Sequence, residues 1–173
     1  MDSDGYLSQL AEIFNGITVN TPSISAIIAI VLAGVLLLAS GFASASEIAF
    51  FSLSPSDLND IDEHNHPADE KISALLGDSE RLLATILITN NFVNVTIIML
   101  CNFFFMNVFV FHSPLAEFII LTVILTFLLL LFGEIMPKIY SAQKTLAFCR
   151  FSAPGIYFLA VSYTHLTLPT NRE

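Results

Sequence analysis

The stretch LTFLLLLFGEIMPKIY, residues 125–140, combines an apolar run with two residues that such a run normally excludes. Roughly 20 apolar residues cross the hydrocarbon core of a bilayer as a helix. Glu134 places a carboxylate near the end of the run, and Pro137 follows three residues later. Because proline has no N–H group, the carbonyl of Gly133, four residues earlier, loses its helical hydrogen-bond partner. The stretch therefore predicts a membrane helix that carries a carboxylate beside an unpaired carbonyl oxygen.

The composition of the whole chain indicates an integral membrane protein. Of its 173 residues, 55% are hydrophobic and 12% are charged, with a mean hydropathy of +0.76. Soluble domains usually carry about a quarter charged residues. Long uncharged runs predict an all-α fold with three transmembrane helices, at about residues 24–50, 82–110 and 114–140. A signal peptide is excluded for the first run, because the 23 residues before it hold three carboxylates and no Lys or Arg.

The distribution of basic residues predicts the orientation of the chain in the plasma (inner) membrane. Two basic residues lie between the first and second spans, and three follow closely after the third: Lys71, Arg81, Lys138, Lys144 and Arg150. The N-terminal segment 1–23 and the connection at 103–114 have none. Because Lys and Arg are retained on the cytoplasmic side, we expect residues 1–23 to lie outside and the C-terminus inside. The net charge of −9 does not alter this, since acidic residues contribute little to topology.

The segment between the first two spans reads as a cytoplasmic helical hairpin. Ser54 can cap a first helix, with Pro55 at its first position and Asp57 at the capping-box spacing. A second short helix can end at Gly77, and Asp78 can cap the helix that continues into the second span. This segment also holds eight of the fifteen carboxylates. It is either a solvated acidic loop or a region that concentrates cations near a pore.

Polar residues within the first span share one helical face. Ser40, Ser44 and Glu47 follow one another at spacings of four and three residues, which place them on the same side of a helix. Gly34 and Gly41 are expected to let another helix approach closely. Serine in a membrane helix commonly bonds its own backbone or a neighbouring helix, so Ser40 alone would be read as structural.

The second and third spans add further oxygen atoms. Asn90 and Asn94 lie four residues apart on one face, with Asn91 displaced from it. In the third span, Glu134 stands beside the unpaired carbonyl of Gly133. Amide, hydroxyl, carboxylate and carbonyl oxygens are ligands that hard cations such as Mg²⁺ and Na⁺ accept. The alternative reading of Glu134 is a carboxylate at the helix end that only reaches toward water.

Other kinds of chemistry find no support in the residues. The sequence contains no CxxC, HExxH or phosphate-loop motif and no nucleophile paired with a base, so we do not expect an enzyme. No basic stripe suggests nucleic acid. Cys101 and Cys149 are predicted at opposite membrane faces and are not expected to form a disulfide.

Three motifs resemble those of a known family. SGFASASEIAFFSL (40–53), TNNFVNV (89–95) and FGEIMPK (132–138) occur in the order found in the DUF21 transmembrane domain, the membrane part of the cyclin M and CorC proteins. The resemblance covers about residues 24–158. That family is associated with magnesium and cobalt homeostasis, and its members are thought to export Mg²⁺ with Na⁺ as the driving ion. The wording of ITNNFVNV and GEIMPKIYS also resembles a gliding-motility-associated branch.

The resemblance implies a specific set of ligands and an assembly. It implicates five side chains as cation ligands and one of two glycines as a source of backbone oxygen: Ser40, Ser44, Asn90, Asn94 and Glu134, with Gly133 or Gly41. Pro137, Glu47 and Asn91 are expected to support this site structurally. The resemblance also implies a homodimer with three spans per protomer. A juxtamembrane belt helix is expected at about residues 141–161, amphipathic and broken at Pro154.

The chain departs from the family pattern near its C-terminus. Family members normally continue into a pair of cytoplasmic CBS modules that bind ATP, and this chain stops where those modules would begin. We therefore expect residues 24–161 to be the membrane domain of a fragment, in which ATP would act only through the absent modules. Residues 162–173 lack the pattern of the belt and resemble a translated library adapter, so we expect a non-native tail.

Together these features predict a membrane transporter domain for divalent cations. The expected activity is Mg²⁺ export coupled to Na⁺, or Mg²⁺ and Co²⁺ homeostasis, by alternating access around a partly dehydrated ion. The expected partners are membrane lipid, the metal cation and a second copy of the chain. The alternative is a non-transporting membrane scaffold or cation sensor, for example a gliding-motility component.

Overall fold

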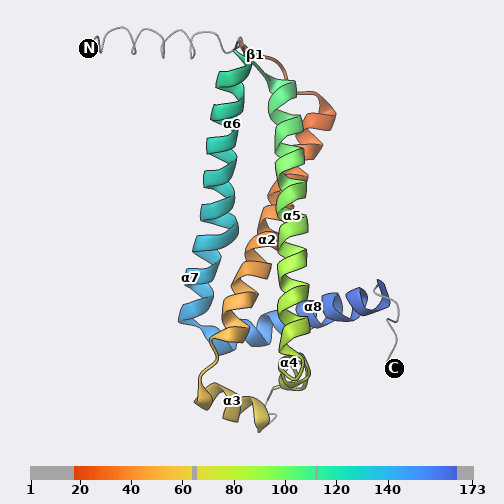
Figure 1. Ribbon diagram of the computed structural model, residues 1–173, viewed down its shortest axis with the longest axis vertical. Helices are drawn as coiled ribbons and strands as arrows, with labels where there is room; N and C mark the ends of the chain where they lie inside the picture. Colours follow the sequence, from red (N-terminus) through yellow and green to blue (C-terminus); the bar gives the residue numbers. More distant parts are fainter. Residues whose placement is uncertain (1–17, 64–65, 112, 167–173) are drawn as a thin grey trace, which may run out of the picture.

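The structure is a computed structural model that describes residues 18–63, 66–111 and 113–166. Most of the predicted extracytoplasmic segment 1–23 lies outside these residues. Three long helical rods run side by side (Figure 1). The first rod is α2 (Ile24–Phe51) and the second is α5 (Ser79–Val108). The third rod comprises α6 (Pro114–Leu128), a π-helix η1 (Leu129–Ile135) and α7 (Met136–Gln143). The all-α membrane fold is thus confirmed.

The third rod extends well beyond the carboxylate at which its uncharged run ends. Pro137 occupies a position in the first turn of α7, where a missing N–H group is tolerated. The backbone before it widens into seven residues of π-helix, in which the N–H group of Met136 donates to the carbonyl of Leu131, five residues earlier. The proline predicted from sequence to interrupt the ladder is therefore accommodated by a change of helix type, and the rod continues to Gln143.

The helix ends predicted between the first two rods form at the expected residues. Helix α3 (Pro55–Asp62) begins with a complete capping box, in which Ser54 Oγ accepts from the Asp57 N–H at 3.2 Å and Asp57 Oδ2 accepts from the Ser54 N–H at 2.9 Å. Helix α4 (Asp69–Leu76) ends at Gly77. Asp78 caps α5 by accepting from the Arg81 N–H at 3.3 Å. We call the end of the bundle that carries α3 and α4 the hairpin end.

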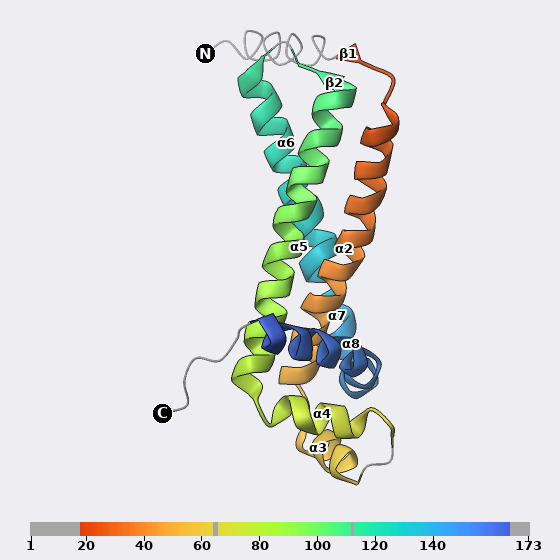
Figure 2. The same ribbon diagram turned by 90° about the vertical axis from the view of Figure 1, so that its right-hand side faces the viewer.

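Helix α8 (Thr145–Leu166) lies crosswise to the three rods at the hairpin end (Figures 1 and 2). Among the described residues, four helical segments are long and apolar enough to cross a membrane, including 145–162 within α8. Length and composition therefore allow four crossings as well as the three predicted. The helix passes through Pro154 without interruption, and the predicted break there is wrong. It also includes residues 162–166, the start of the predicted tail; residues 167–173 lie outside the described part.

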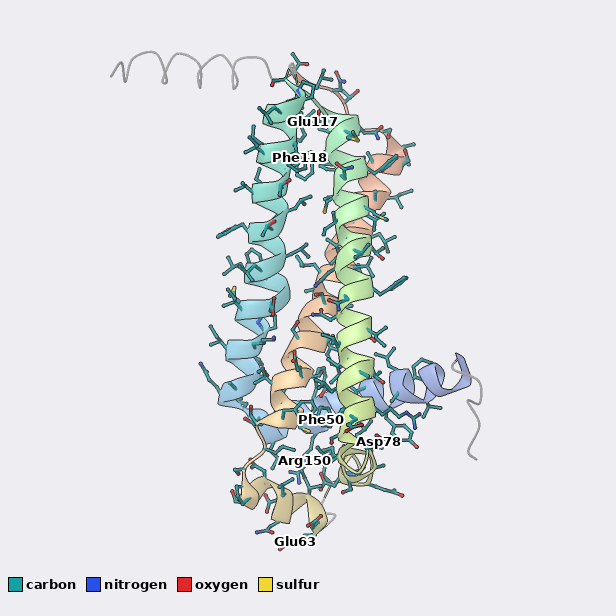
Figure 3. All side chains as sticks on the ribbon, in the orientation of Figure 1. Phe50, Glu63, Asp78, Glu117, Phe118 and Arg150 are labelled. Carbon is teal, nitrogen blue, oxygen red and sulfur yellow. The ribbon has the colours of Figure 1, made fainter. Side chains whose placement is uncertain are left out.

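A buried core joins α3, α4 and α8 to the first two rods. Its members come from five helices, and the largest of them are Phe50, Ile61, Ile72, Leu75, Leu82, Ile86 and Ile156. Figure 3 shows Phe50, Asp78 and Arg150 at this junction, while Glu117 and Phe118 lie at the far end of the bundle. Because α8 contributes residues to this core, it is fixed crosswise by packing as well as by its connection to α7.

A two-residue ribbon, which the sequence did not predict, closes the opposite end. Strand β1 (Thr18–Val19) pairs antiparallel with β2 (Phe109–Val110), and the N–H group of Asn20 donates to the carbonyl of Val108 at 2.7 Å. The ribbon connects the start of α2 to the end of α5, so we call this the ribbon end. Below it, a groove of about 530 Å³ separates α5 from α6, with Asn102 and Glu117 in its lining.

Candidate cation site

Three oxygen atoms from two rods converge at Ser40. Its Oγ lies 2.8 Å from Asn90 Oδ1 and 2.6 Å from Asn94 Oδ1, and Ser40 itself is 0% exposed. The two asparagines lie one turn apart on α5, which explains why both reach the same hydroxyl. A hydroxyl carries a single proton, so it can donate to only one of the two amide oxygens at a time. The second amide can either donate its NH2 group to Ser40 Oγ after a flip or turn its oxygen toward a positive group.

The backbone of the third rod completes this cluster. A Cβ atom built on Gly133 would lie 3.2 Å from Ser40 Oγ and 3.4 Å from Leu37 Cδ1. Only a residue without a side chain lets η1 approach the hydroxyl this closely. The structure thus brings together four residues that the sequence assigned to one site: Ser40, Asn90, Asn94 and Gly133. Their role as ligands stays a prediction.

Ser44 continues the same face of α2 one turn toward the hairpin end. Its Oγ is buried and has no hydrogen-bond partner among the described residues. Leaving a buried hydroxyl without a partner costs about 1–3 kcal/mol. Ser46, also buried on α2, differs because its Oγ donates to the carbonyl of Phe42 at 2.7 Å. The Ser44 hydroxyl therefore lacks the hydrogen bond that the Ser46 hydroxyl makes.

Of the two glycines predicted to allow close helix contact, only Gly41 does so within the chain. A Cβ atom on Gly41 would lie 3.0 Å from Pro137 Cγ and 3.3 Å from the Phe132 carbonyl oxygen. Gly34 has no such neighbour within 4 Å. The absence of a side chain at Gly41 therefore lets the proline ring press η1 and α7 against α2, immediately beside the Ser40 cluster.

The carboxylate of Glu134 forms a second, charged group with two other residues. Lys138 Nζ lies 3.2 Å from Glu134 Oε1 and 3.3 Å from Glu47 Oε2. The structure thus groups Glu134 with Lys138 and Glu47, and Glu134 Oε1 accepts a hydrogen bond from Lys138 Nζ. The sequence reading counted Lys138 only as a topological charge, although its four-residue spacing from Glu134 is that of a helical ion pair. Asn91 is exposed on another face of α5, as predicted.

A buried ion pair outside the bundle holds α8 to the hairpin, and the sequence reading missed it. Arg150 binds Asp69 through two hydrogen bonds, Nε to Oδ1 at 2.8 Å and Nη2 to Oδ2 at 3.0 Å. The Asp69 side chain is 0% exposed and also accepts from the His66 N–H at 2.9 Å. The Arg150 hydrogen bonds outweigh burial and hold the pKa of Asp69 below its ordinary value. This carboxylate of the acidic segment is therefore buried, not solvated.

The remaining carboxylates do not build a second metal centre of their own. Within the described ranges, no group of three or more His, Cys, Asp or Glu residues could hold a metal ion. Cys101 and Cys149 are both buried and both unpaired, as predicted. The candidate site is thus made of neutral oxygens, with the charged group of Glu47, Lys138 and Glu134 near it.

Comparison with known proteins identifies one family. The family model described as "Cyclin M transmembrane N-terminal domain" matches residues 26–172. A search of curated proteins gives no match.

Proposed function

This chain belongs to the family of cyclin M transmembrane N-terminal domains, and from that premise we propose that it is the membrane domain of an exporter of Mg²⁺. The family is one of membrane metal transporters, and the chain is a multi-pass membrane protein. We propose further that Na⁺ supplies the driving gradient for this export.

The observation that carries the proposal is the convergence of oxygens at Ser40. Mg²⁺ is held by oxygen ligands at about 2.0–2.1 Å in octahedral geometry and gives up its water reluctantly. The hydroxyl of Ser40 and the amide oxygens of Asn90 and Asn94 lie close enough to replace part of that shell after small movements. The buried hydroxyl of Ser44 offers a further oxygen. Since these groups are neutral, they bind a divalent ion weakly enough to release it.

The position of the site suits alternating access from the hairpin end. Ser40 lies eleven residues before the end of α2, which is about 17 Å along a helix with a rise of 1.5 Å per residue. Its distance to the start of α2 is larger, about 24 Å, by the same measure. A cation would therefore reach the cluster more directly from the hairpin end, lose part of its water there, and leave toward the ribbon end. Na⁺ could use the same oxygens in the opposite direction.

We propose that the hairpin end faces the cytoplasm and that the membrane is the plasma membrane. The basic residues of the described chain gather at this end: Lys71, Arg81, Lys138, Lys144 and Arg150. Such an excess marks the cytoplasmic side of a membrane protein. With α8 lying crosswise at the same end, we assign three crossings to the rods and place α8 along the membrane surface.

A homodimer would cover polar groups that the single chain leaves exposed. Asn91 and Asn102 are both exposed on α5, within a helix that we assign to the membrane. Polar side chains in the hydrocarbon core nearly always face protein or a water-filled cavity. We therefore propose that a second copy packs against α5. Native mass spectrometry from a mild detergent should show twice the mass of the chain, and a strictly monomeric mass would contradict the assembly.

The proposal is tested by removing single buried hydroxyls from α2. Ser40→Ala should abolish the stabilisation by Mg²⁺, because a ligand that binds only the folded state raises its stability. Ser46→Ala is the matched control, since it deletes a buried serine of the same helix whose hydroxyl bonds its own backbone. The readouts are Mg²⁺-dependent thermal stability and Mg²⁺ flux in proteoliposomes with and without a Na⁺ gradient. Equal Mg²⁺ responses in both variants would favour a membrane scaffold over a transporter.

A further inference from the structure

Lys138 places one positive charge between two carboxylates that come from different rods. Its ammonium lies 3.3 Å from Glu47 Oε2 on α2 and 3.2 Å from Glu134 Oε1 on η1. The three side chains together carry a net charge of −1. One ammonium thus occupies a position between two carboxylates where a metal ion could also be held, since carboxylate oxygens are ligands of hard cations.

This group lies on the path between the Ser40 cluster and the hairpin end. Glu47 follows Ser40 by seven residues on the same helix, which is about 10 Å toward the hairpin end. Lys138 lies five residues beyond Gly133, about 8 Å in the same direction. A cation that approaches the cluster from the hairpin end therefore passes the charged group first.

The exposure of these side chains makes the lysine easy to displace. The side chains of Lys138, Glu47 and Glu134 are 28%, 32% and 47% exposed. Ion pairs that are this exposed to water are individually weak. A metal cation that binds the carboxylate more strongly than lysine does would therefore displace the lysine. Lysine also ends in a point charge on a flexible four-carbon stem, so its head can move aside without rearranging the backbone.

We propose that Lys138 is an internal competitor of the transported cation: it binds Glu47 and Glu134 when the metal is absent and yields them when the metal arrives. The inference rests on the proposed transport function and adds a mechanism that limits affinity. Without the lysine, a divalent ion would meet two uncompensated carboxylates and would be held tightly. With Lys138 present, a metal ion that binds the carboxylates must displace the lysine ammonium. The ammonium returns to the carboxylates when the metal ion leaves.

The competition has a thermodynamic signature that an ordinary structural ion pair lacks. In Lys138→Met, the two carboxylates repel each other, so the metal-free protein should melt at a lower temperature than the wild type. Mg²⁺ should restore the stability, because the ion replaces the missing charge. The Kd for Mg²⁺ should fall about tenfold, the factor expected from removing two weak exposed ion pairs that compete with it.

The experiment measures the Mg²⁺ titration of thermal stability for the full chain in detergent. Lys138→Arg keeps the charge and should keep a Kd near that of the wild type. Lys144→Met removes an exposed lysine six residues away and serves as the matched control. Lys138→Gln provides a second neutral variant if Lys138→Met does not fold. An unchanged or weaker Kd in the neutral variants, or a stability loss that saturating Mg²⁺ does not restore, would overturn the inference.

A parallel measurement on Ser40→Ala separates this inference from the proposed function. If Ser40→Ala still responds to Mg²⁺ like the wild type, the cation site itself is wrong. If Ser40→Ala loses the response while the neutral Lys138 variants bind no more tightly than the wild type, the site stands and the competitor role of Lys138 is rejected.

Discussion

At the scale of single residues, the volume beside the Ser40 hydroxyl is controlled by Gly133. An added Cβ would lie 3.2 Å from Ser40 Oγ, a contact tighter than most real side chains make. We expect Gly133→Ala to cost about 1–3 kcal/mol of stability, as overpacking does, and to weaken Mg²⁺ binding without deleting any ligand side chain. The measurement is the Mg²⁺ titration of thermal unfolding.

Gly34→Ala is the control for this substitution. Gly34 lies on α2 with no neighbour within 4 Å of an added Cβ. Alanine should therefore stabilise the helix by about 0.5–1 kcal/mol and leave the Mg²⁺ response intact. Equal Mg²⁺ responses in the two glycine variants would mean that the approach of η1 to Ser40 has no part in binding.

The buried carboxylate of Asp69 gives a second prediction at this scale. Asp69→Asn leaves the Arg150 guanidinium without its counter-charge, and removing one partner of a buried ion pair costs about 3–5 kcal/mol. We expect the lower end of that range, because Arg150 keeps partial contact with water. Glu70→Gln, at an exposed neighbouring position, should cost less than about 1 kcal/mol. Chemical denaturation of both variants checks the difference.

The same carboxylate predicts a dependence of stability on acid. The pKa of Asp69 lies below its ordinary value of 3.8, chiefly because Arg150 hydrogen-bonds the ionised form. A group whose pKa is lower in the folded state stabilises the fold above the unfolded-state pKa and loses this contribution as the pH falls through the folded-state pKa. The stability gap between wild type and Asp69→Asn should thus be constant from pH 7 to about 5 and shrink below pH 3.8. A gap that grew or stayed constant as the pH fell below 3.8 would contradict this.

Helical spacing was enough to predict that Asn90 and Asn94 share one face of α5. That Ser40 of α2 meets both of them depends on how the two rods pack, which spacing within one helix cannot reveal. The sequence did not indicate that Glu47 would join Glu134 and Lys138, because that contact depends on how α2 and α7 pack. The burial of Asp69 could not be predicted for the same reason, since its partner lies 81 residues away.

At the scale of elements, the contact between Gly41 and Pro137 predicts a coupled effect. Gly41→Ala alone should destabilise the protein by about 1–3 kcal/mol, because its Cβ would lie 3.0 Å from Pro137 Cγ. Pro137→Ala removes that ring carbon and restores an N–H group to the rod. In the double variant the clash with the ring is absent, so the two changes should cost less together than the sum of each alone.

A double-mutant cycle by thermal or chemical unfolding measures this coupling. Gly155→Ala combined with Pro137→Ala is the matched control, because an added Cβ at Gly155 would meet only Phe42 at 3.4 Å. Additive costs in the Gly41 cycle would show that the close approach of α2 and α7 does not depend on the proline ring.

Local sequence signals predicted the helix ends that depend on neighbouring residues. They failed where the backbone conformation depends on contacts with distant parts of the chain. The capping box of α3, the end of α4 at Gly77 and the cap of α5 at Asp78 formed as expected, because each uses residues within one turn. Pro154 was expected to break a helix, but α8 continues through it. The π-helix before Pro137 and the two-residue ribbon carry no pattern that composition or periodicity could detect.

At the scale of the whole molecule, the charge distribution predicts which end of the bundle faces the cytoplasm. In a background in which the buried Cys101 and Cys149 are replaced by alanine, a membrane-impermeant maleimide should label Asn20→Cys on intact cells. It should label Glu70→Cys only after permeabilisation. Both positions are exposed, so reactivity reports the side of the membrane and not burial. The reverse pattern would invert the topology.

The position of α8 in the whole molecule could be predicted from the sequence only in part. The hydropathy of this helix alone allows a fourth crossing. Its placement became predictable only through the resemblance to a family with a belt helix. In the structure, the placement follows from three kinds of contact: the core residues of α8, the Asp69–Arg150 pair, and the Arg81 Nη2 bond to the Ala160 carbonyl at 3.0 Å.

The groove between α5 and α6 has a mechanical consequence. Rods α2 and α5 are tied together at both ends, by the ribbon and by the hairpin core. Helix α6 packs against α5 through Leu125, and a groove of about 530 Å³ lies between the two helices. Helix α7 stays pressed to α2 through Pro137 and Gly41. We therefore expect the distance between α6 and α5 to change more readily than the distance between α7 and α2. A spin-label distance between α5 and α6 should vary with Mg²⁺, and the distance between α2 and α7 should not.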